Sequence, residues 1–196
     1  DTTTKTFVMT EKNSTFQGQY EDNAYYTNNT KQYYVLRSYL EQLESTGGGT
    51  ITIKKGTYSL SNCLFIPSNV TITMEDGVII NKVKPTESVY IEAYQKARNG
   101  FMFMFVPPSK AEKTSSVGGY NGTMNSKLIG QGTVIIDMKE FDGGTGLTTG
   151  HSQNITIQNI QLKGLRSTDE KGAHYIEVNS SKNVLIEGCF FNGHVG

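Results

Sequence analysis

The chain has 196 residues, with 18 lysines and arginines against 18 aspartates and glutamates, so its formal net charge at neutral pH is zero. This length predicts one domain, and the balanced charge argues against a nucleic-acid partner, which requires an excess of cations. The longest apolar run, Phe101 to Val106, is far shorter than the roughly 20 residues that cross a bilayer, so no membrane span is expected.

The first elements in chain order are an arm and a helix. Residues 1–28 are polar and show no period, which predicts an extended N-terminal arm. Residues 30–45 place apolar side chains on one helical face, with Asn29 as the expected N-cap and Gln32 three residues later. Those apolar side chains are Tyr33, Leu36, Leu40 and Leu43. We expect this helix to cap the open end of the β-structure that follows.

Short strand-like segments then recur along the chain. They end at Ile72, Ile129, Ile157 and Ile186, which are spaced 57, 28 and 29 residues apart. The first gap is two periods long, which predicts a hidden repeat at Phe101–Phe105 after an insertion at about residues 84–100. A period of 28 or 29 residues with many turn residues predicts a solenoid, in which each coil buries its inner face against its neighbours. The four isoleucines should form one inward column, and residues 29–196 one β-helix domain.

Three asparagines share one register just before the strands. Asn69, Asn154 and Asn183 stand where asparagine tolerates a left-handed turn, and the amide of each can bond to the neighbouring coil. We interpret them as an internal ladder, and because that position lies inside the stack, glycan attachment there is disfavoured. Cys63 and Cys189 should be about four coils apart, beyond disulfide reach, and therefore unpaired.

The capping helix, the asparagine coils and two glycine-containing stretches together carry a resemblance. The stretches are Gly47–Tyr58 and Ile129–Asp137. From about Lys31 to Gly196 the chain resembles the right-handed parallel β-helix superfamily of pectate lyases and polygalacturonases. The resemblance implies an all-β fold, a right-handed parallel β-helix with an N-terminal capping helix.

Members of that superfamily hydrolyse, eliminate, epimerise or only bind polysaccharide. The resemblance therefore implies a bacterial, extracellular or cell-surface polysaccharide-active protein, either a glycoside hydrolase or a polysaccharide lyase. The alternative is a non-catalytic carbohydrate-binding surface adhesin with the same fold. Where polygalacturonase-like enzymes carry two catalytic aspartates, this chain aligns His174 with the first and Gly193-His194 near the second. The absence of that acidic pair favours the alternative.

His174 and His194 each open a coil and are predicted to lie on neighbouring rungs, a histidine cluster suited to proton transfer. Glu177 would join them as a third catalytic residue if the chain bends at the coil corner. Tyr175 and Glu177 alternate with apolar residues and should face outward, which makes Tyr175 a candidate sugar contact. His151 falls in another register, as a turn residue or a second substrate contact. A solvated polar surface is the competing interpretation for all of them.

The densest acidic group could hold calcium, which prefers oxygen ligands. Its members are Asp137, Glu140 and Asp142, but their irregular spacing favours a solvated loop, and no cofactor is expected. The repeat stops where a new coil should start, and no second cap follows it. We therefore expect these residues to be an N-terminal part of a longer β-helix, inactive alone, with another chain, a copy or a continuation covering the last coil.

Overall fold

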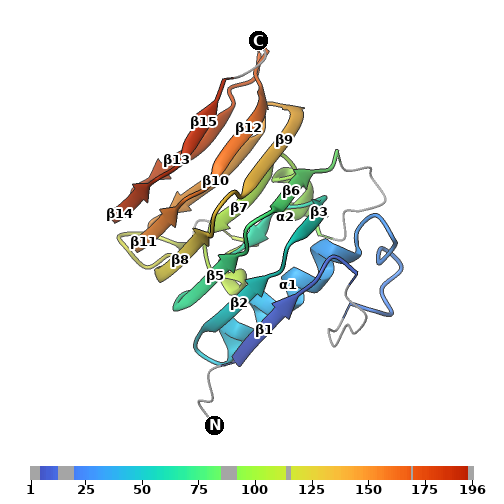
Figure 1. Cartoon of the computed structure of the whole chain (residues 1–196). Helices are drawn as coiled ribbons and strands as arrows, with labels where there is room; N and C mark the ends of the chain where they lie inside the picture. Colours follow the sequence, from blue (N-terminus) through green and yellow to red (C-terminus); the bar gives the residue numbers. More distant parts are fainter. Residues whose placement is uncertain (1–4, 13–19, 85–91, 114–115, 169, 194–196) are drawn as a thin grey trace.

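The protein forms a stack of β-coils, each of which supplies strands to three parallel sheets (Figure 1). This structure is a computed structural model and describes residues 5–12, 20–84, 92–113, 116–168 and 170–193. Sheet A contains β1 (Lys5–Met9), β2 (Gly49–Ile53), β5 (Val70–Met74), β8 (Met124–Gly130), β11 (Gln153–Gln158) and β14 (Lys182–Glu187). Sheet B contains β3 (Gly56–Leu60), β6 (Val78–Lys82), β9 (Ile135–Asp142), β12 (Gln161–Arg166) and β15 (Phe190–Asn192). Sheet C contains β4 (Leu64–Phe65), β7 (Phe101–Phe105), β10 (Thr145–Gly150) and β13 (His174–Asn179). The predicted all-β parallel solenoid is confirmed.

The inward column of sheet A differs from the predicted one at a single position. Leu128 pairs with Ile72 on one side and with Ile157 on the other, and it is fully buried. Ile129 pairs with Thr73 and is only half-buried. The prediction that Ile129 belongs to this column is therefore wrong by one residue, because two adjacent apolar residues leave the face of the strand ambiguous.

The expected hidden repeat is also wrong. β5 pairs directly with β8, so no coil lies between them, and β7 belongs to sheet C instead. The additional length lies in two connections of one coil, the segment between β6 and β7 and the segment between β7 and β8. The first carries the short helix α2 (Ala93–Ala97), and the second carries the 3₁₀ turn η2 (Pro108–Lys110).

A ladder of asparagines marks the corner before sheet A, and it has four members. Asn69, Asn125, Asn154 and Asn183 all have left-handed backbones, with φ between 53° and 59°. Each Nδ2 donates to the Oδ1 of the preceding member, at 3.3, 2.9 and 3.1 Å in turn. The ladder is confirmed, but its side chains are exposed, so its expected place inside the stack is wrong. Left-handed asparagine at a tight corner turns the chain without the steric cost that other side chains incur.

Helix α1 (Lys31–Ser45) covers the N-terminal end of the stack, as predicted. Its apolar face joins the core through Tyr33, Tyr34, Leu36, Leu40 and Leu43. The expected cap differs, because Thr30 rather than Asn29 precedes the helix and bonds through its hydroxyl to the Tyr25 carbonyl at 2.6 Å. Gln32 instead accepts a hydrogen bond from the Ser59 backbone N–H at 2.7 Å.

Two further expectations concern the cysteines and the membrane. Cys63 is buried, Cys189 is half-buried, and both are free thiols, as predicted. No helix in the described ranges is long and apolar enough to cross a membrane.

Candidate functional site

The residues predicted to be catalytic do not form a visible cluster. His174 opens β13, is exposed, and donates its backbone N–H to the Gly144 carbonyl at 3.1 Å. Glu177 is half-buried further along β13, and its carboxylate accepts a hydrogen bond from Asn179 Nδ2 at 3.0 Å. His194 lies outside the described residues. A shared role for these three residues remains a prediction.

His151 stands apart from His174. It follows β10 in a left-handed turn with φ 51°, and its Nδ1 lies 3.0 Å from the Gly119 carbonyl oxygen. Because Gly150 pairs with Asn179, His151 lies at the opposite end of sheet C, about 20 Å along the strands from His174. The two histidines therefore cannot act on the same bond.

Tyr175 does not face outward as its alternation predicted. Its ring packs against the core and lies 6.0 Å from the Phe191 ring. Its hydroxyl donates to the Asn192 carbonyl at 3.0 Å and accepts from the Leu165 N–H at 3.3 Å. The preceding coil has Gly146 at this corner, and a Cβ there would lie 2.6 Å from the Tyr175 carbonyl oxygen. The Tyr175 hydroxyl therefore bonds within the protein.

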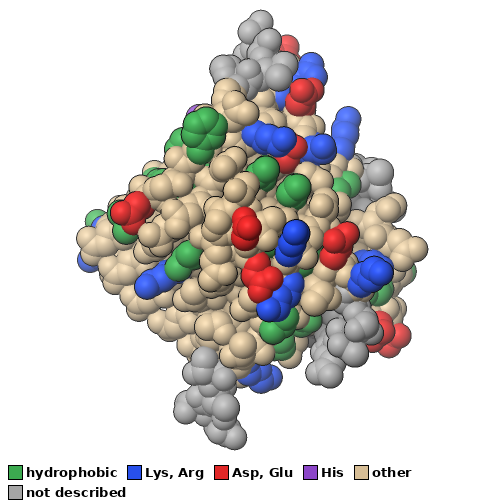
Figure 2. All heavy atoms as spheres, viewed as in Figure 1, with side chains coloured by type: hydrophobic (Ala, Val, Ile, Leu, Met, Phe, Trp, Pro, Cys, Tyr) green, Lys and Arg blue, Asp and Glu red, His purple; other side chains and the backbone are tan. Residues whose placement is uncertain are grey.

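A large cleft lies instead where the strands of sheet B end and those of sheet C begin. It has a volume of about 800 Å³. Its charged lining residues are Lys82, Lys84, Lys139, Glu140, Asp142, Arg166 and Lys171. Five of these seven side chains carry positive charge when protonated, so the cleft is locally basic although the whole chain is neutral. Figure 2 shows lysine and arginine side chains, with some acids among them, near the ends of β9 and β12.

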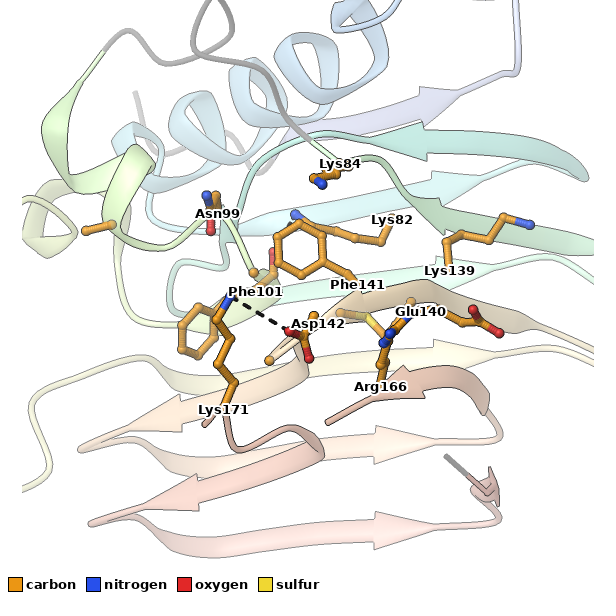
Figure 3. Close-up of a pocket in the computed structure, with 14 residues that line it drawn as sticks. Lys82, Lys84, Asn99, Phe101, Lys139, Glu140, Phe141, Asp142, Arg166 and Lys171 are labelled. Carbon is orange, nitrogen blue, oxygen red and sulfur yellow. Dashed lines mark hydrogen bonds and ion pairs between the residues drawn. The ribbon is translucent and has the colours of Figure 1, made fainter. Parts of the chain in front are cut away.

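The side chains that line the cleft come from successive coils of the stack (Figure 3). Lys82 ends β6, Asp142 ends β9 and Arg166 ends β12, and Asp142 is level with Arg166 in the paired strands. Lys171 comes from the connection between β12 and β13, and Phe101 from the start of β7. The parallel register therefore builds the cleft from residues that are far apart in sequence.

A bulge in β9 shapes the mouth of the cleft. The register between β9 and β12 shifts between Asp137 and Phe141, so β9 has additional residues there. Lys139 and Glu140 both have left-handed backbones, with φ 51° and 56°. Each such residue costs about 1–3 kcal/mol, and strain of this kind concentrates at functional sites. The bulge places Lys139 and Glu140 on the lining of the cleft.

Two exposed cations of the cleft have no acidic partner among the residues that the structure describes. Lys84 and Arg166 are exposed, and neither side chain forms a hydrogen bond or ion pair with a described residue. The carboxylate of Asp142 is occupied by contrast, because it accepts from the Thr168 N–H at 3.1 Å and lies 3.8 Å from Lys171 Nζ. The cleft thus offers unpaired positive charge to a ligand.

Lys82 is the buried cation of the cleft, with a relative exposure of 3 %. Its Nζ donates to the carbonyl oxygens of Ser61 at 3.1 Å and Phe101 at 3.0 Å, and it lies 5.7 Å from the centre of the Phe141 ring. No carboxylate of the described residues lies within 4 Å of it. Burial lowers the pKa of this amine to about 7, because the charged form loses its hydration.

The acidic group considered for calcium borders the same cleft. Asp137 accepts from the Lys139 N–H at 2.8 Å, and its other oxygen lies 3.7 Å from both Lys139 Nζ and Lys163 Nζ. No cluster of three histidine, cysteine or acidic side chains suited to a metal occurs in the described part of the chain. A shallower hollow of about 340 Å³ continues from the cleft over Lys163 and shares its Lys139 and Glu140.

The basic lining of this cleft was not predicted from the sequence, because the expected sites were built on histidines and carboxylates. The basic residues are spread from position 82 to position 171, and no short motif links them. The available signal was positional, since Lys82, Asp142 and Arg166 each end a strand of the same sheet. That signal becomes readable only when the register of the coils is known.

No family model matches the chain. One curated protein similar to it is the plasmin and fibronectin-binding protein A of Streptococcus pneumoniae (strain ATCC BAA-255 / R6), with 24% identity over 153 residues. The match covers 76% of this chain and 20% of that protein, so the chain spans about a fifth of the relative's length.

A solved structure similar to the chain is a provisionally named glycosyl hydrolase from Parabacteroides merdae ATCC 43184. The two share 15% sequence identity, and the match covers 83% of this chain and 88% of the other, with a TM-score of 0.34. A likeness this distant does not distinguish one function from another.

Proposed function

We propose that the protein is a cell-surface or secreted carbohydrate-binding module that holds an acidic polysaccharide in the basic cleft. The supporting observation is the unpaired positive charge of Lys84 and Arg166 beside the buried Lys82. Carboxylates or sulfates on successive sugars would form charge-assisted hydrogen bonds with these groups. The hollow over Lys163 extends the cleft and gives room for more than one sugar unit.

Binding rather than catalysis agrees with the occupied Asp142 and with the absence of the expected acidic pair. It also agrees with the name of the curated relative, which describes a protein that binds plasmin and fibronectin. Because this chain corresponds to about a fifth of that relative, the same protein partners are a weaker proposal for it than a polysaccharide.

The binding experiment compares polygalacturonate oligomers with neutral oligosaccharides of the same length by calorimetry. We expect only the acidic oligomers to bind. We expect the double variant Lys84→Met/Arg166→Met to lose about a hundredfold or more in affinity, because each of the two charge-assisted bonds contributes about 1.5–3 kcal/mol. Lys54→Met is the matched control, since Lys54 lies at the opposite end of sheet B and pairs with Glu75 at 2.7 Å. Equal binding of neutral oligomers, or wild-type affinity in the double variant, would reject the proposal.

A second candidate function is cleavage of the bound chain by hydrolysis or elimination. The observation that favours it is Glu140, an exposed carboxylate on the strained bulge with no hydrogen bond or ion pair to a described residue. New reducing ends without ultraviolet absorbance would indicate hydrolysis, and both signals together would indicate elimination. Activity that survives Glu140→Gln but is lost in His174→Ala would indicate that His174, and not Glu140, is the catalytic residue.

A further inference from the structure

The hydrogen bonds of the Lys82 amine are compatible with both its charged and its neutral form. An ammonium has three N–H donors, and the described structure supplies two carbonyl acceptors, those of Ser61 and Phe101. A neutral amine has two N–H donors and can satisfy the same two carbonyls. Either form therefore donates to both carbonyls.

Without a bound anion, burial disfavours the charged form of Lys82, and its neighbours do not compensate for the lost hydration. The other cations that line it are Lys84, Lys139, Arg166 and Lys171. Of the two acids, Asp142 is engaged by Lys171 and Glu140 is exposed at the mouth. From the side of β4, the buried Cys63 thiol adds no compensating negative charge near neutral pH, because burial raises its pKa to about 12. The Phe141 ring offers only a weak cation–π contact at 5.7 Å.

A bound anion reverses this balance, because it supplies the missing acceptor and a compensating charge. We propose that an anionic group held in this cleft is recognised by the protonated form of Lys82, so that ligand binding takes up a proton and tightens as the pH falls through neutrality. This inference rests on the proposed binding function for the class of its physiological ligand. A purely structural Lys82, which only ties Ser61 to Phe101, would make binding independent of its protonation.

The direct test follows the Hε and Cε NMR signals of Lys82 as a function of pH. The signals are assigned by their loss in Lys82→Arg, and the titration is repeated in chloride, in sulfate and with polygalacturonate oligomers. We expect the midpoint of Lys82 to rise by about one pH unit with sulfate or oligomer. A midpoint that neither anion moves would overturn the inference.

The second arm measures oligomer affinity at pH 6 and pH 8. Wild-type affinity should fall about fivefold over this interval, because a midpoint near pH 7 that rises by about one unit on binding limits the linked change in affinity to that factor. Lys82→Arg, which keeps its charge, should remove the dependence, whereas Lys84→Met should weaken binding and keep it. The same pH dependence in Lys82→Arg would contradict the inference. If sulfate moves the midpoint but no oligomer binds, the proposed function fails and the inference about Lys82 stands.

Discussion

The burial of Lys82 lowers the stability of the folded protein. The charged amine loses its hydration, and no carboxylate of the described residues pairs with it. A methionine of similar length would avoid this desolvation cost but would no longer donate to the Ser61 and Phe101 carbonyls. Retaining a lysine at such a position is understandable if the amine serves the cleft rather than the core.

The pH dependence of stability should reveal that cost. Between pH 7 and 8.5 the unfolded chain keeps the proton on Lys82 while the folded protein releases it, so the free energy of unfolding should rise with pH, by at most about 1.4 kcal/mol per unit from this group. Lys82→Met should reduce the slope, and its stability relative to wild type should be lowest at high pH, where the wild-type amine is already neutral. Urea denaturation at several pH values measures both effects, with Lys84→Met as the control for loss of a lysine. An unchanged slope in Lys82→Met would show that Lys82 is not desolvated.

At the level of single residues, little of the candidate site could be predicted from the sequence. His151 lies in a left-handed turn after Gly150, as expected, and its role as a substrate contact stays a prediction. Tyr175 packs against the core and bonds to residues of neighbouring strands, which a local pattern cannot reveal. The cleft lysines likewise meet only through the pairing of distant strands.

Among the elements, the corner before sheet A is held by the asparagine ladder. Asn154 donates to Asn125 at 2.9 Å and accepts from Asn183 at 3.1 Å, so it stands in the middle of the ladder. Its φ of 55° is a conformation that alanine adopts only with strain.

Substitutions at Asn154 separate the two contributions. Asn154→Ala should lower the free energy of unfolding by about 2–3 kcal/mol, because it loses two exposed hydrogen bonds and strains the backbone. Asn154→Gly loses the same bonds without that strain and should be more stable than the alanine variant by about 1 kcal/mol or more. Chemical denaturation gives both values. Equal stability of the two variants would mean that the left-handed turn contributes nothing.

The ladder also shows why a correct pattern can be aligned wrongly. Asn69 and Asn154 stand three residues before Ile72 and Ile157, and Asn125 stands three residues before Leu128. Placing Ile129 in the column therefore hid the fourth asparagine as well. The existence of the strands was predictable from the period, whereas their register required the pairing itself.

For the whole molecule, stacking means that each coil is stabilised mainly by its immediate neighbours. The same inward column therefore has different surroundings along its length. Ile72 is 0 % exposed in the middle of the stack, and Ile186 is 38 % exposed in β14.

A pair of equal substitutions tests this difference. Ile72→Ala should cost about 2–5 kcal/mol, because it leaves a cavity in a packed core, and Ile186→Ala should cost less than about 1 kcal/mol. Thermal or chemical denaturation of both variants, with matched protein concentrations, provides the comparison. Similar costs would indicate that another surface covers the last coil in solution, which is the arrangement expected from the sequence.

The three corners of the coil also differ in the lengths they accept. Connections from sheet A to sheet B contain two to four residues, whereas those from sheet B to sheet C and from sheet C to sheet A both range from two residues to 18. The basic cleft lies at this second corner, where the backbone of the frame does not restrict loop length. Loops grafted at this corner could therefore diversify ligand choice while the stacked frame stays intact, which makes the protein a natural scaffold for directed evolution.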